Sequence, residues 1–128
     1  MNSRLLLVDD NPDVITLLER RLNAKGYETV AAHNASEALT ILETSRVDIA
    51  ILDVMMPGIS GYDMVKIIND KFENPPPIIL YSAVEDVDDR VKGKEARAYT
   101  YVVKTPTGSL LLDTIRAALD SCGRKILV

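Results

Sequence analysis

The sequence predicts an α/β fold, a doubly wound parallel sheet of five strands with helices on both faces. Five short apolar segments recur along the 128-residue chain, and stretches with the apolar spacing of helices separate them. This alternation is typical of a parallel sheet covered on both sides. The apolar segments are continuous, as strands buried on both faces are. We expect strands at 5–8, 28–32, 49–52, 78–81 and 100–103, with the third at the centre.

Capping residues mark where the first two helices begin. Asn11 can cap a helix whose first position is Pro12, and Gly26 ends it. Asn34 and Glu37 have the spacing of a capping box that opens a second helix, although Ser or Thr is the more usual first member. In the first helix, Val14, Ile15, Leu18 and Leu22 fall on one apolar stripe, and the second helix is expected to run through Leu39 and Leu42.

The sequence signals for the remaining helices differ in strength. Ser60 can cap a third helix, and Ser109 begins the last. A fourth, between 85 and 95, has a thin apolar stripe and contains Gly93, which costs about 1 kcal/mol relative to Ala in a helix interior, so we expect it to be short. The predicted core-facing residues are Met64, Ile67 and Ile68 in the third helix, and Leu111, Leu112, Ile115 and Leu119 in the last.

The composition limits the possible functions. The formal net charge is −4, whereas nucleic-acid-binding surfaces are basic, so we expect no direct nucleic-acid contact by this domain. No apolar run is long enough to cross a bilayer, and the first residues lack a signal peptide's apolar segment, so we expect no membrane role and a cytoplasmic location. We assign one domain to residues 1–121 and regard 122–128 as a tail or the start of a linker in a longer protein.

Three acidic residues follow predicted strands, at the edge where doubly wound sheets bind their ligands. Asp9 and Asp10 come after the first strand, and Asp53 comes after the third. Taken singly, each is as readily a turn or helix-cap residue. If the two strands are neighbours, the carboxylates converge, and like charges at close range disfavour one another unless a cation neutralises them. Oxygen ligands of this kind suit Mg²⁺.

Two further strand ends carry groups that complement an anion. Ser82 follows the fourth strand and offers a hydroxyl, and Lys104 follows the fifth and offers a positive charge. Either residue alone is more often a turn former or a solvated surface charge. With the carboxylates, they meet the needs of a carboxylate nucleophile attacking phosphorus, which requires a metal and donors to the equatorial oxygens. The pattern predicts Asp53 as a phosphoryl acceptor.

In combination, these motifs resemble the receiver domain of bacterial two-component response regulators, and the resemblance covers essentially the whole chain. It implies a flavodoxin-like sheet with strand order 2-1-3-4-5. The segments that carry it are Leu5 to Asp10, Ile51 to Gly58, Tyr81 to Ala83, and Tyr101 to Lys104.

The resemblance also implies a role for each matching residue. Asp53 would accept a phosphoryl group from a histidine kinase or a phosphotransfer protein. The implied magnesium ligands are Asp9, Asp10, Asp53 and the backbone carbonyl of Met55. The implied phosphoryl pocket consists of Ser82 and Lys104, which bind the phosphoryl oxygens, and Ala83, which leaves room for the group.

The implied readout is a population shift, in which the new charge favours one of two states through its differential contacts. Tyr101 would turn inward and remodel a face that binds an output protein or a covalently linked output domain. An ordinary half-buried strand aromatic is an equally good interpretation of Tyr101. The sequence leaves open whether phosphorylation promotes a homodimer.

Two departures from the family pattern lie near that output face. The family usually has Pro, with a cis peptide, directly after the lysine, whereas here Thr105 precedes Pro106. A cis bond before Thr105 would cost roughly 2.5–4 kcal/mol, so we predict a trans bond or a rearranged loop. Arg97 also stands where the family often has Gly.

Two alternatives to a phosphorylated receiver remain. The first is a pseudo-receiver that only binds partner proteins, which the intact acidic residues disfavour and the altered lysine loop favours. The second is a phosphatase with an aspartyl-phosphate intermediate. Such enzymes typically place a general acid two residues after the nucleophile, where this chain has Met55, which cannot donate a proton. We therefore expect a stoichiometric acceptor with slow loss of its own phosphate and not an enzyme.

Overall fold

The computed structural model describes residues 3–56, 58–82, 98–104 and 109–127, with side chains up to residue 120. The predicted fourth helix lies outside the described residues, as do Ala83, Arg97, Thr105 and Pro106. The strands are β1 (Arg4–Val8), β2 (Glu28–Ala32), β3 (Ile49–Asp53), β4 (Ile78–Ser82) and β5 (Thr100–Val103). The helices are α1 (Pro12–Ala24), α2 (Ala35–Thr44), α3 (Gly61–Lys71) and α5 (Ser109–Leu127).

The described strands form one parallel sheet in the order β2-β1-β3-β4-β5, as predicted. Every residue of β3 and of β4 is buried, which explains their continuous apolar runs and confirms β3 as a central strand. Since β1 pairs with both β2 and β3, the strand order reverses between β1 and β3. The carboxyl ends of these two strands are therefore where a ligand site is expected.

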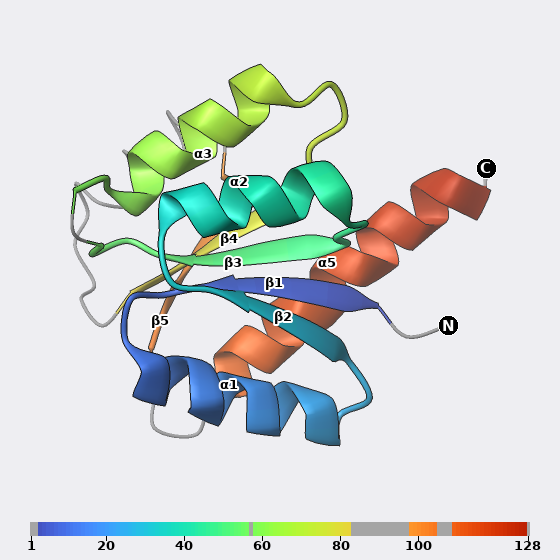
Figure 1. Ribbon diagram of the computed structural model, residues 1–128. Helices are drawn as coiled ribbons and strands as arrows, with labels where there is room; N and C mark the ends of the chain where they lie inside the picture. The colour runs from blue at the N-terminus through green and yellow to red at the C-terminus, as the bar shows by residue number, and fades with distance from the viewer. Residues whose placement is uncertain (1–2, 57, 83–97, 105–108, 128) are drawn as a thin grey trace.

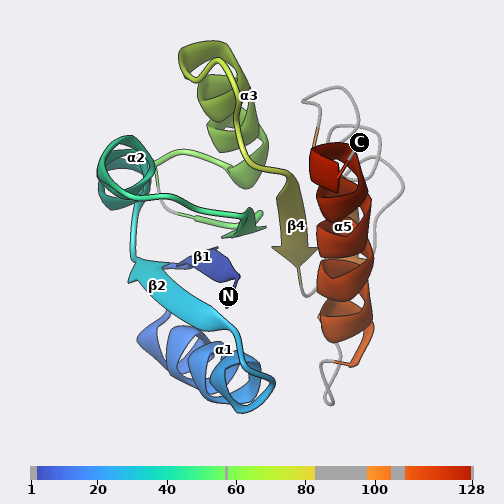
Figure 2. The same ribbon diagram turned by 90° about the vertical axis from the view of Figure 1, so that its right-hand side faces the viewer.

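Helices cover both faces of the sheet (Figure 1). α1 and α5 pack on one face, and α2 and α3 pack on the other. Figure 2 shows α3 and α5 on opposite sides of β4. Residues alternate between the two layers along each strand, so that Leu5 and Leu7 join the layer of α1 and α5, whereas Leu6 and Val8 join the other.

The predicted starts of α1, α2 and α3 are confirmed by capping hydrogen bonds. The Asn11 side chain accepts from the amide of Asp13, and the Asn34 side chain accepts from the amide of Glu37. Ser60 caps α3 by accepting from the amide of Asp63. Each bond satisfies an amide that has no partner within its own helix.

Some predicted core-facing positions are only partly buried, namely Val14 in α1, Ile67 in α3, and Leu112 and Leu119 in α5. Val65 is fully buried, whereas the predicted Ile67 is only partly buried. In α2 the fully buried residue is Ala38, and Leu39 and Leu42 are partly buried. The apolar residues of each helix span more than one stripe, so spacing alone does not say which positions face the sheet.

The last helix continues to Leu127, so residues 122–127 are helical. The boundary at residue 121 stays a prediction. Among the described residues, no helix combines the length and the apolarity that crossing a bilayer requires.

Candidate functional site

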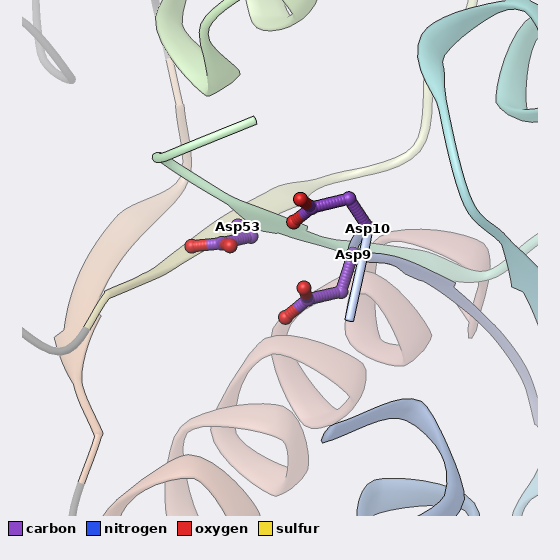
Figure 3. A group of neighbouring side chains, drawn as sticks. All are labelled: Asp9, Asp10 and Asp53. Atoms are coloured by element: carbon purple, nitrogen blue, oxygen red, sulfur yellow. The ribbon is translucent and has the colours of Figure 1, made fainter. Parts of the chain in front are cut away.

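Three carboxylates meet at the point where the strand order reverses (Figure 3). Asp9 and Asp10 follow β1, and Asp53 ends β3. One oxygen from each residue lies within 4.8 Å of the oxygens of the other two. Asp9 and Asp53 are only 3% and 9% exposed, whereas Asp10 is exposed to solvent. The predicted convergence is therefore confirmed.

Hydrogen bonds to the backbone hold Asp9 and Asp53 in place. The amide of Asp9 donates to the carbonyl of Ala32 at 3.1 Å, which extends the pairing of β1 with β2 by one residue. The Oδ1 atom of Asp9 accepts from the amide of Asn11 at 2.9 Å. The Oδ1 atom of Asp53 accepts a longer bond, 3.3 Å, from the amide of Met55. Neither side chain is free to turn away without losing a bond.

The pKa of Asp53 is raised above its ordinary value of 3.8. Burial is the largest cause, because it disfavours the charged form, and the negative charges of Asp9 and Asp10 raise the pKa further. The positive charge of Lys104 and the Met55 amide act in the opposite direction. A cation bound among the three carboxylates would favour the ionised form that a nucleophile needs.

Lys104 reaches back over the acidic site from the end of β5. Its Nζ atom lies 3.5 Å from an oxygen of Asp9 and 3.7 Å from an oxygen of Asp53. Its backbone amide donates to the carbonyl of Ser82 at 2.6 Å, which continues the pairing of β4 with β5. The ring of Tyr81 lies on the same path, with its centre 5.4 Å from Nζ. The predicted convergence of Lys104 with the carboxylates is confirmed.

The other predicted residues occupy different parts of this edge. Ser82 is buried at the end of β4, opposite Val103 in the strand register. Tyr101 is partly buried against the layer of α2 and α3, and its switch role stays a prediction. Met55 is exposed in the loop after β3. Its backbone carbonyl stays a predicted ligand, as does the role of Ala83.

Gly61 contributes to the site in a way the sequence reasoning missed. Its amide donates to the carbonyl of Val54 at 3.0 Å, and a Cβ atom placed on it would lie 2.6 Å from the carbonyl oxygen of Asp53. α3 can therefore begin against the end of β3 only because residue 61 has no side chain. A glycine directly after the cap Ser60 was the available signal.

Comparison with known proteins agrees with the fold. Residues 5–116 match the response regulator receiver domain family. The chain is 40% identical over 116 residues to the probable transcriptional regulator ycf27 of Cyanophora paradoxa, covering 91% of this chain and 48% of that protein. It is 38% identical over 120 residues to the transcriptional regulatory protein PrrA of Mycobacterium tuberculosis, covering 94% and 51%.

A solved structure shows the same fold. The response regulator TrrA of Thermotoga maritima, in complex with Mg²⁺-BeF, aligns with a TM-score of 0.82 and 35% identity, covering 91% of this chain and 99% of that one. The chain belongs to the response regulator receiver domain family. It spans about half the length of the curated relatives it matches.

Proposed function

We propose that Asp53 accepts a phosphoryl group in a magnesium-dependent reaction and that this modification controls an output function. The observation that carries the proposal is the convergence of three carboxylates within 4.8 Å, with the Lys104 ammonium beside two of them. Three like charges so close together oppose folding unless a ligand compensates them. A binding site for a cation and an anionic group provides that compensation.

In the proposed reaction, a carboxylate oxygen of Asp53 attacks the phosphorus atom of a phosphohistidine on a kinase or a phosphotransfer protein. A P–O bond to Asp53 forms, the P–N bond breaks, and the released imidazole takes up a proton. Lys104, 3.7 Å from Asp53, neutralises charge on the phosphoryl oxygens. The hydroxyl of Ser82 donates to the same oxygens once the group is in place.

The donor set fits magnesium, which prefers hard oxygen ligands and keeps several waters. Asp9, Asp10 and Asp53 would hold the ion, with the carbonyl of Met55 as a further ligand. Bound magnesium would supply charge neutralisation during phosphoryl transfer. The relative TrrA supports this proposal, because its structure was solved in complex with Mg²⁺-BeF.

Phosphorylation is proposed to act through a partner. The matching relatives are transcriptional regulators about twice as long as this chain, which supports a linked or separate output protein that reads the phosphorylated state. Tyr101, beside the core on β5, is the proposed switch residue. The domain acts as a stoichiometric acceptor and not as an enzyme, since hydrolysis of its own aspartyl phosphate only resets it.

Intact-mass spectrometry after incubation with acetyl phosphate and Mg²⁺ tests the proposal. The wild type is expected to gain one phosphoryl group, and chelation of the metal should abolish the gain. Asp53→Asn should gain none, whereas Asp70→Asn, a matched change at an exposed position of α3, should behave as the wild type. Equal uptake by Asp53→Asn refutes the assignment. A wild type without uptake or any magnesium-dependent signal supports the pseudo-receiver instead.

A further inference from the structure

Tyr81 lies on β4, the strand between β3, which carries Asp53, and β5, which leads to Lys104. In the strand register, Tyr81 of β4 is opposite Asp53 of β3 on one side and Val102 of β5 on the other. Side chains two residues apart on a strand point to the same face, so Lys104 emerges on the face of Val102 and Tyr81. To reach Asp53, two strands away, the lysine side chain must cross Tyr81. The observed Nζ position, 5.4 Å from the ring centre, reflects that path.

The other contacts of the ammonium group are weakly directional. The separations of 3.5 Å and 3.7 Å from Asp9 and Asp53 are longer than a charge-assisted hydrogen bond, about 2.7–2.9 Å. These contacts attract the ammonium without fixing its position, and lysine has four rotatable bonds to order.

The Tyr81 ring is suited to supply the missing restraint. The side chain is 5% exposed and belongs to the core layer of α1 and α5, so its orientation is set by packing. An aromatic face attracts a cation within about 6 Å of its centre, and the attraction strengthens where water is excluded. The side chain of Lys104 is 24% exposed. A fixed ring below a partly dehydrated ammonium group is a favourable arrangement for such a contact.

We propose that Tyr81 is a positioning residue, whose aromatic face holds the Lys104 ammonium over the acidic site for phosphoryl transfer to Asp53. The inference rests on the proposed function and adds to it a specific requirement for an aromatic ring at the penultimate position of β4. The hydroxyl group of Tyr81 is not required.

The test compares initial rates of phosphorylation by acetyl phosphate with Mg²⁺ in Tyr81→Leu and Tyr81→Phe. Tyr81→Leu is expected to be about fivefold slower, the change that about 1 kcal/mol of cation–π contact produces at about 1.4 kcal/mol per tenfold. Tyr81→Phe keeps the ring and should match the wild type. Ile79→Ala, in the same strand and core layer, controls for lost packing and should leave the rate nearly unchanged.

A double-mutant cycle separates positioning from packing. If Tyr81 acts through the lysine, Tyr81→Leu should have no further effect in a Lys104→Met background. An equal loss in both backgrounds overturns the proposal, as does a Tyr81→Leu rate equal to the wild type.

A second measurement does not depend on phosphorylation. Trace labelling of lysines with acetic anhydride, followed by mass spectrometry, should show faster modification of Lys104 in Tyr81→Leu and no change in Tyr81→Phe. If the wild type takes up no phosphoryl group, the proposed function fails. The labelling experiment then tests by itself whether Tyr81 holds the Lys104 ammonium in place. Equal labelling of Lys104 in the wild type and Tyr81→Leu then overturns it.

Discussion

Replacing Gly61 by Ala should destabilise the domain and impair Asp53 together, because the start of α3 presses against the end of β3. A Cβ atom at position 61 would lie 2.6 Å from the carbonyl oxygen of Asp53 and 2.9 Å from the Cα of Val54. Both distances are below the 3.0 Å that Cβ atoms in proteins essentially never undercut. Both obstructing atoms belong to the backbone, so relief requires movement of α3 or of the strand end.

The expected magnitude follows from two opposing effects. Overpacking of this kind costs about 1–3 kcal/mol. Ala is favoured over Gly in a helix interior by up to about 1 kcal/mol, and by less at the first helical position. We therefore expect a net loss of about 1–2 kcal/mol in the free energy of unfolding. Because the clash is with the Asp53 backbone, the phosphorylation rate should also fall.

Urea unfolding followed by circular dichroism, alongside the acetyl phosphate assay, measures both effects. Gly26→Ala is the matched control, since Gly26 has φ 90° with nothing within 4 Å of an added Cβ. The Gly26→Ala variant should lose about 1–2 kcal/mol in its free energy of unfolding through backbone strain alone. Gly26 precedes β2, at the opposite end of the sheet from the carboxylates, so its phosphorylation should stay normal. A Gly61→Ala variant as stable as the wild type, with an unchanged rate, would refute the close approach.

Three further outcomes are expected. First, Asp53→Asn should be more stable than the wild type at neutral pH without metal. Because folding raises the pKa of Asp53, protonation of this side chain stabilises the folded state. This contribution is fully present below pH 3.8 and is lost as the pH rises through the folded-state pKa. The stability difference between Asp53→Asn and the wild type should be smaller when urea unfolding is measured at acidic pH. A difference of the same size at every pH would contradict the effect of burial on the pKa of Asp53. Second, Mg²⁺ should raise the thermal midpoint, by an amount equivalent to about 2.7 kcal/mol at a hundredfold excess over Kd. Calorimetry should show this rise abolished in Asp9→Asn, and its retention there would exclude Asp9 as a ligand. Third, Ser60→Ala removes the cap of α3 and should cost about 1 kcal/mol in urea unfolding, whereas no change would mean that the cap is dispensable.

The sequence was sufficient for features that depend on neighbouring residues. The starts of α1, α2 and α3 follow from side-chain caps that bond to amides two or three residues along the chain. The strands follow from runs of apolar residues that are buried on both faces. The acidic residues could be placed at strand ends for the same reason, since each apolar run stops where its strand ends.

The sequence was less informative where a position depends on distant parts of the chain. It indicated that Asp9 and Asp53 meet only on the condition that β1 and β3 are neighbours. Spacing within α3 did not distinguish Val65 from Ile67, because the sheet that selects between them is not part of the helix. The same limit applies to Gly61, whose lack of a side chain matters only once α3 lies against Asp53.

The described strands, the caps of α1, α2 and α3 and the residue types at the strand ends could be read from the amino-acid sequence, because local hydrogen bonds and periodic burial specify them. Three placements became known only from the folded chain: three carboxylates lie within 4.8 Å, α3 begins against the backbone of Asp53, and Lys104 crosses the ring of Tyr81. These placements follow from the register between strands far apart in the chain, which long-range packing sets and no local pattern encodes.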